Sequence, residues 1–288
     1  MALLPSFFLV QIAFAPLPLP YVQALESIRA ECSLDQAASL ELTFNLSRTV
    51  IGELDLQLFD IFRPMVPISV RLGLGSFVPG TLVNGYVRHT RLEQGHEPGS
   101  AKLIVTALDA TATLMNHVEQ PMLHPNMPAS VIAALIFGRY GMVPAVFPTP
   151  PSRTVLDTTT TQRKTDIRFL KELAAHHGYE CYVQPDPLAG IDTNIGELIR
   201  QNVSIATRSS RAIRAEGTVD GLRFGRILRP GLPVAVRGAG MQHSGHYYVT
   251  RVSHEITTDR YRQSFTAWRN AVGVTGAEMF LDPLAALA

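Results

Sequence analysis

Two segments that lie far apart in this chain repeat one pattern of residues. Residues 63–71 read RPMVPISVR and residues 229–237 read RPGLPVAVR, which makes five of nine positions identical. At a constant offset of 160 residues farther along, the matches are Gly85 with Gly245, Thr90-Arg91-Leu92 with Thr250-Arg251-Val252, and Thr106-Ala107 with Thr266-Ala267. Such a repeat predicts one supersecondary unit used twice, a proline-bounded strand followed by a turn and a hairpin. The alternative is chance similarity between two strand-rich segments.

The residues around the first copy of the repeat alternate as strands do. Leu40, Leu42, Phe44 and Leu46 are separated by polar residues, which is the period of a sheet with one face in water. The same period recurs in Leu54, Leu56 and Leu58, and further strands are expected at 68–71, 83–92 and 102–108. We therefore expect an antiparallel barrel in this part of the chain.

The apolar residues 1–15 allow more than one interpretation. We expect a first buried strand here, followed by the connector Pro16–Pro20. Residues 13–15 also resemble a signal-peptidase site, but no Lys or Arg precedes Arg29, whereas a secretory signal begins with positive charge. The unbroken apolar run is too short for a membrane span.

The middle of the chain predicts helices. Asp109 can cap a short helix that runs to Met115, and Pro128 can begin a helix over 129–139 that Gly141 ends. A third helix starts at Thr165 or Asp166 and ends at His176-His177-Gly178, where histidines complement the negative helix end. A strand is expected at Tyr179–Val183, residues 143–151 are expected to be irregular, and strands return over 217–266.

Composition and motifs give no case for catalysis. The formal net charge is +1, and the two cysteines define neither a disulfide framework nor a zinc site. No nucleotide-binding or protease motif occurs, and His243 and His246 lie in a glycine-flanked turn that does not fix a metal geometry. Eight arginines stand between 200 and 237 against two acidic residues, which we interpret as a solvated face rather than a basic wall for DNA or an acidic partner.

Residues 161–183, TQRKTDIRFLKELAAHHGYECYV, resemble a segment of phage late control protein D and of the N-terminal part of VgrG spike proteins. The shared pattern is Gln, then Thr/Ser-Asp, Phe-Leu, Leu-Ala and Gly before an aromatic strand. Residues 230–236, 245–254 and 265–273 resemble the closing barrel of the same family. The resemblance covers roughly residues 20–273 in order and is loosest before Gly73.

This resemblance implies an α+β, mainly β fold with two similar antiparallel β-barrel domains and a helical region between them. The expected boundaries are 1–108 for the first barrel, 109–196 for the mixed region, 197–275 for the second barrel and 276–288 for a tail. Three such chains would form a pseudo-six-fold ring that joins a hexameric tail tube to a trimeric spike. The chain stops without the oligonucleotide-fold and needle domains of VgrG proteins, which favours a stand-alone hub with a separate spike.

The implied function is that of a structural baseplate hub of a contractile phage tail or injection machine, assembled in the bacterial cytoplasm. The implied partners are two further copies, the spike, the tube or tube-initiator protein and baseplate wedge proteins, with no cofactor, no specific nucleic-acid binding and no membrane span. Structural roles are expected for Asp166, Phe169, Leu170, Leu173 and Gly178 in the third helix and its docking. The matched arginines, Arg71, Arg91, Arg237 and Arg251, are expected to face a neighbour or the lumen.

Two other functions compete with the hub. A tail-associated peptidoglycan hydrolase would need paired carboxylates, which carry no local sequence signature. A secreted binding module would need the N-terminus to be cleaved.

Overall fold

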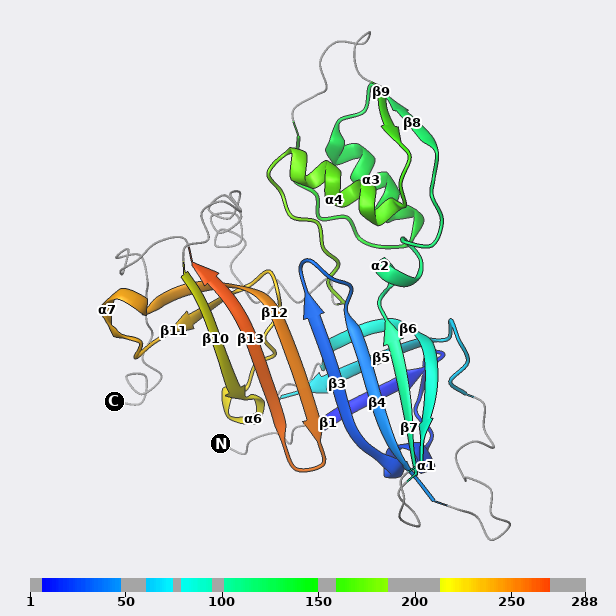
Figure 1. Ribbon diagram of the computed structural model, residues 1–288, viewed down its shortest axis with the longest axis vertical. Helices are drawn as coiled ribbons and strands as arrows, with labels where there is room; N and C mark the ends of the chain where they lie inside the picture. Colours follow the sequence, from blue (N-terminus) through cyan, green and yellow to red (C-terminus); the bar gives the residue numbers. More distant parts are fainter. Residues whose placement is uncertain are drawn as a thin grey trace.

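The computed structural model describes residues 7–47, 61–74, 79–94, 101–149, 159–185 and 213–269. Over these ranges the chain is mainly β, and one 11-stranded antiparallel sheet runs through it (Figure 1). The strand order is β10-β13-β12-β3-β4-β7-β6-β5-β1-β2, and β11 pairs with β12 off this path. A helical region stands at one side of the sheet, at the top of Figure 1.

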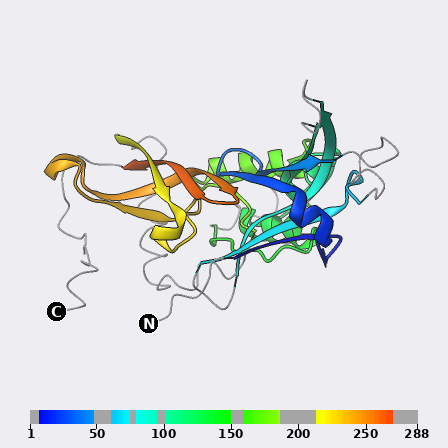
Figure 2. The same ribbon diagram turned by 90° about the horizontal axis from the view of Figure 1, so that it is seen from below.

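The first half of the sheet follows from the alternation seen in the sequence. Its elements are β1 (Phe7–Ile12), β2 (Ala15–Pro16), α1 (Leu19–Ala24), β3 (Leu25–Ser33), β4 (Ser39–Leu46), β5 (Pro67–Gly73), β6 (Gly80–Glu93) and β7 (Ala101–Leu108). The four alternating side chains of β4, from Leu40 to Leu46, are all buried. Strands β1 and β5 cross behind β3 and β4 (Figures 1 and 2), and their inward residues share one core with β4.

The middle region contains α2 (Ala110–Thr113), β8 (Met122–Pro125), α3 (Ala129–Arg139), β9 (Thr159–Gln162) and α4 (Asp166–His176). The side chain of Asp109 caps α2 by accepting from the amides of Thr111 and Ala112, because these first amides have no partner within the helix. Gly141 and Gly178 follow α3 and α4 with φ of +68° and +73°. The predicted helices are therefore confirmed, and α2 is shorter than expected.

The second half contains β10 (Ile213–Asp220), α6 (Gly221–Phe224), β11 (Pro233–Val236), α7 (Gly240–His243), β12 (Gly245–Thr257) and β13 (Tyr261–Arg269). The long strand β12 has two neighbours along one edge. Its first part pairs with β11, and residues 251–257 pair with β3 from the first half. The two halves of the chain are thus joined by hydrogen bonds into one sheet.

Most of the predicted architecture is confirmed, with two differences. The fold is mainly antiparallel β with a helical region in between, but no sheet of the described residues closes into a barrel. The predicted strand at Tyr179–Val183 is wrong, because this segment is extended but pairs with no strand. The strand predicted at 54–58 and the tail at 276–288 lie outside the described residues. No helix among the described residues has both the length and the apolar character for crossing a membrane.

Candidate assembly interface

The repeat in the sequence is a repeat in the structure. In the first copy, the amide of Met65 donates to the Val87 carbonyl (2.8 Å) and the amide of Val87 donates to the Val66 carbonyl (2.9 Å). In the second copy, Gly231 donates to Val249 (2.9 Å) and Val249 donates to Leu232 (3.0 Å). The turn residue has positive φ in both copies, +69° at Met65 and +86° at Gly231. The two turns are therefore equivalent.

The equivalence extends over four strands. A bulge interrupts β6–β7 pairing between Val87 and His89, and another interrupts β12–β13 pairing between Val249 and Arg251. Strand β4 flanks β7 as β10 flanks β13, which makes Glu41 equivalent to Glu216, since both lie opposite the matched threonines of β7 and β13. We call β4, β5, β6 and β7 the first unit and β10, β11, β12 and β13 the second unit.

The structure corrects part of the sequence alignment. Because Val87 is equivalent to Val249, the offset along β6 and β12 is 162 residues and not 160. The equivalent of Arg251 is therefore His89, and that of Arg91 is Ser253. Arg71 remains equivalent to Arg237, since the turn and the following strand keep the offset of 166 residues.

The two units differ in how well their edges are covered. In the second unit, Val252 and His254 are 0% and 1% exposed, because β3 lies beside this part of β12. Their equivalents in the first unit are Thr90 and Leu92, and both are exposed, Leu92 at 37%. No described strand lies beside β6 in the place that β3 takes beside β12. The first unit therefore has an uncovered edge along residues 88–93.

The second unit has an uncovered edge of its own. Strand β4 is covered by β3, and the inward residues of β4 are at most 2% exposed. Its equivalent β10 pairs only with β13 among the described strands, and Ala215, Gly217 and Val219 are only half-buried. The chain therefore presents two uncovered edges, β6 on the first unit and β10 on the second. Inside the chain, the corresponding edges are joined through β3.

The face of the sheet that points away from the core is polar and its charges are paired. Arg29 on β3 lies 3.8 Å from Glu41 and 3.4 Å from Glu255, and Arg251 on β12 lies 3.2 Å from Glu31. All of these side chains are partly exposed, so each pair stabilises the fold only weakly. A broad polar face of this kind is suited to contact with water rather than to burial in a core.

All four predicted arginines are exposed in the single chain, and they fall into two groups. Arg91 and Arg251 lie on β6 and β12. There they pair with Glu93 (2.7 Å) and Glu31. Arg71 lies on β5, opposite Leu9 of β1 and away from the buried side of that strand. Arg237 directly follows β11. Whether these side chains meet a neighbouring chain stays a prediction.

The residues predicted to carry the third helix surround a buried polar network. Asp166 is 1% exposed and accepts from the Tyr140 hydroxyl (2.6 Å) and from Nε2 of Gln162 (2.5 Å). Oε1 of the fully buried Gln162 lies 3.2 Å from Nε2 of His124, which stacks on Phe169. Because Gln162 donates to Asp166, its carbonyl oxygen accepts from His124. Sequence reasoning selected Asp166 and Phe169 but missed His124 and Tyr140.

The other residues of this group have separate positions. Leu170 is buried in the small core between α3 and α4, and Leu173 packs partly buried against it. Gly178 is exposed, and its positive φ ends α4. The charge of Asp166 is complemented by Arg139 at 3.9 Å, at the end of α3. The network therefore ties α4 to α3 and to the β8–β9 ribbon.

The middle region is attached to both units by a few contacts. Lys171 on α4 donates to the Asp35 carbonyl (2.7 Å), and Asn84 on β6 donates to the Pro185 carbonyl (2.8 Å). Tyr248 on β12 donates to Glu180 (3.1 Å). Tyr182 lies over Gly231, where an added Cβ would come 2.6 Å from the phenol oxygen. This last contact needs a glycine at the turn.

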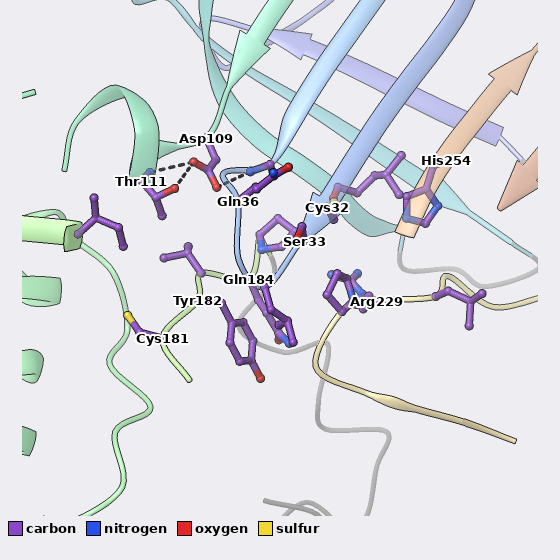
Figure 3. A pocket seen from close by; sticks show the side chains of 18 of the residues that line it. Cys32, Ser33, Gln36, Asp109, Thr111, Cys181, Tyr182, Gln184, Arg229 and His254 are labelled. Carbon is purple, nitrogen blue, oxygen red and sulfur yellow. Dashed lines mark hydrogen bonds between the residues drawn. The ribbon is translucent and has the colours of Figure 1, made fainter. Parts of the chain in front are cut away.

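A pocket lies where the middle region and the two units meet (Figure 3). Its polar lining includes Cys32, Asp109, Arg229 and His254. Burial raises the pKa of the Cys32 thiol to about 12, and burial followed by the nearby Arg229 lowers the pKa of His254 to about 3. At neutral pH the thiol is protonated and the imidazole is neutral. The pocket therefore has no activated thiolate, which a cysteine nucleophile would require.

The described residues show no group of three or more His, Cys, Asp or Glu side chains that could hold a metal. His243 and His246 are exposed, at the end of α7 and the start of β12. The basic stretch predicted over 200–237 lies partly outside the described residues.

Comparison with known proteins gives structural similarity without sequence similarity. No family model and no curated protein matches this chain. A 43 kDa tail protein of prophage MuSo2 from Shewanella oneidensis has a TM-score of 0.66 at 11% identity, over 93% of this chain and 100% of that one. A tail protein from Neisseria meningitidis MC58 has a TM-score of 0.59 at 10% identity, over 92% and 97%.

A third similar structure belongs to an injection system. The E. coli protein c3393, a component of the type VI secretion system with structural similarity to the T4 bacteriophage tail proteins gp27 and gp5, has a TM-score of 0.56. The identity is 15%, over 96% of this chain and 79% of that one. At these identities the comparisons show a shared fold. The fold expected from the resemblance to tail and VgrG proteins is thereby confirmed.

Proposed function

We propose that this chain, which has the fold of phage tail and type VI secretion proteins, is the structural hub of a contractile tail or injection machine. Three copies form a ring of six similar units that joins a hexameric tail tube to a trimeric spike. Each unit belongs to one barrel-like domain, within residues 1–108 and 197–275, and the mixed region 109–196 lies between them. The hub acts through its interfaces and not through catalysis.

The observation that carries this proposal is the pair of uncovered edges. Within the chain, the β4 edge of the first unit is joined through β3 to the β12 edge of the second unit. The equivalent edges that stay uncovered are β10 of the second unit and residues 88–93 of β6 in the first unit. Joining the second unit of one copy to the first unit of the next would repeat the contact already made inside the chain. A head-to-tail contact of this kind generates a ring when its rotation closes.

The polar face supports a role as the wall of an open channel. A ring that continues the sheet from copy to copy turns one face of the sheet inward, and the face with paired charges tolerates water there. We place Arg91 and Arg251 on this lumen wall. Arg71 and Arg237 lie on strands β5 and β11, at the outer side of the units, where they face neighbouring proteins.

The partners follow from the position of such a ring. One end would contact the tube or a tube-initiator protein, the other end a separate spike, and the periphery the baseplate wedge proteins. The E. coli protein of similar fold is a component of the type VI secretion system. The particle is therefore either a virion or a related injection machine.

Native mass spectrometry and negative-stain imaging of the purified chain, alone and with a candidate spike, test the proposal. We expect a trimer whose images show six lobes around a pore, either with the chain alone or once the spike is added. A chain that stays monomeric across the concentration series, with and without the spike, contradicts the proposal. Turnover of purified peptidoglycan that a carboxylate variant loses would favour the hydrolase instead.

A further inference from the structure

The two units differ at a third edge, which the ring does not use. In the first unit, β5 has β6 on one side and β1 on the other, with Gln11 opposite Ser69 and Ile12 opposite Ile68. In the second unit, the equivalent strand β11 pairs with β12, and no described strand lies on its other side. Strand β11 lies at the far left end of Figure 1, away from β1.

The hydrogen-bonding groups at this edge can be assigned from the equivalence. The Pro67 carbonyl accepts from the amide of Ala13 at the end of β1, so Pro67 and every second residue after it face β1. In the second unit the Leu232 carbonyl faces β12, which turns the Pro233 carbonyl the other way. The outward groups are then the carbonyls of Pro233 and Ala235 and the amides of Ala235 and Arg237.

The core under β11 is incomplete in the same place. Ile68 and Val70 on β5 are 2% and 0% exposed, because Val10 and Ile12 of β1 add to the same core. Their equivalents Val234 and Val236 are only half-buried. Among the described residues, nothing in the second unit takes the place of β1. An added strand with apolar residues at every second position would complete this core and this ladder together.

The charge around β11 indicates which strand fits. Between Asp220 and Glu255 the sequence contains no Asp or Glu, but it contains Arg223, Arg226, Arg229, Arg237 and Arg251. Arg229 and Arg237 stand at the two ends of the repeat motif that contains β11. An extended segment with acidic residues at its ends is favoured there over a neutral or basic one.

We propose that β11 accepts an extended segment of a partner protein as an added strand, with alternating apolar residues and acidic ends. This is recognition by β-augmentation, in which main-chain hydrogen bonds give affinity and side-chain positions give specificity. The edge and its chemistry do not depend on the ring. Only the inference that the donor is another tail component rests on the proposed function.

The probe is a fluorescein-labelled peptide that carries residues 7–12, the sequence of β1, between two pairs of glutamates. Fluorescence anisotropy with the full chain measures its affinity, and amide hydrogen exchange locates it. We expect binding in the micromolar range, with slowed exchange at Ala235 and Arg237. Two control peptides have lysines in place of the glutamates or N-methyl groups on alternate amides, and each binds at least about tenfold more weakly.

A matched pair of variants separates this edge from its equivalent. Arg237→Glu should weaken the peptide at least about tenfold, because the charge at the β11 edge is reversed. Arg71→Glu should leave the affinity unchanged, since the β5 edge is already filled by β1. Equal effects of the two variants would overturn the assignment, and so would slowed exchange at 67–73 in place of 233–237.

Two further results would also overturn it. Amides of Ala235 and Arg237 that already exchange slowly without peptide would show that a segment of this chain occupies the edge. Equal binding of the N-methylated peptide would show that the ladder is not involved. A chain that forms no ring but binds the peptide at β11 refutes only the proposed function, whereas a ring that binds no peptide refutes only this inference.

Discussion

Replacing Asp166 by alanine should open the middle region selectively. The buried carboxylate accepts from the Tyr140 hydroxyl and from Gln162, and each hydrogen bond to a charged group contributes about 1.5–3 kcal/mol. Tyr140 can turn to water, but Gln162 is fully buried and would keep an unsatisfied donor. We therefore expect Asp166→Ala to lower the free energy of opening this region by about 3–4 kcal/mol.

Amide hydrogen exchange of peptides from α3 and α4 measures this change directly. A loss of about 3–4 kcal/mol corresponds to exchange that is about 100- to 1,000-fold faster, with little change in β3 or β12. Asp166→Asn keeps an acceptor for Gln162 and offers a donor to the Tyr140 oxygen, so its loss should be about 1–2 kcal/mol. Glu172→Gln is the control on the same helix, because that carboxylate is exposed and pairs only with Lys164. If Asp166→Ala speeds exchange less than tenfold, or if the asparagine is as damaging as the alanine, the network does not hold α3 and α4 together.

Three other predictions test the repeat and the pocket. Gly231→Met should cost about 2–4 kcal/mol in urea unfolding, since φ is +86° and the side chain would displace Tyr182, whereas Met65→Gly should change stability by about 1 kcal/mol or less; similar losses would contradict the equivalence of the two turns. Between pH 7 and pH 5 the unfolded chain takes up a proton at His254 that the folded chain, with a pKa of about 3, does not bind, so stability falls with pH by about 2 kcal/mol at this residue, and His254→Gln should lack that share of the pH slope. Burial raises the pKa of Cys32 to about 12 and that of Cys181 to about 11, so a maleimide at pH 8 should label both slowly in the folded protein and rapidly in urea; fast labelling of folded Cys32, followed by intact mass, would contradict the buried position.

The sequence was sufficient to predict elements with strong local signals. The alternation from Leu40 to Leu46 places every apolar side chain in the core, and the caps at Asp109 and Gly178 lie at helix ends as expected. These signals are local because hydrogen-bond period and backbone angle depend on a few neighbouring residues.

Long-range relations were less accessible. The alternation of Tyr179, Cys181 and Val183 suggested a strand, but Cys181 packs on the core of the helices while Tyr182 lies over Gly231. The alignment of the repeat was two residues out along β12, because the matched Thr-Arg pairs occupy different positions relative to the bulge. Whether an edge is covered depends on β3, which flanks one unit on each side and leaves no signature in either.

The position of β3 has a consequence for how the protein is made. Residues 25–33 emerge early in synthesis, yet their partners in β12 are residues 251–257, and the Arg29–Glu255 pair spans 226 positions. Contacts this distant form slowly and only after the ribosome has produced most of the chain. A nascent first unit must therefore wait with one side of β3 unpaired. The same delay keeps an unfinished chain from presenting a complete second unit, so assembly begins only with full-length copies.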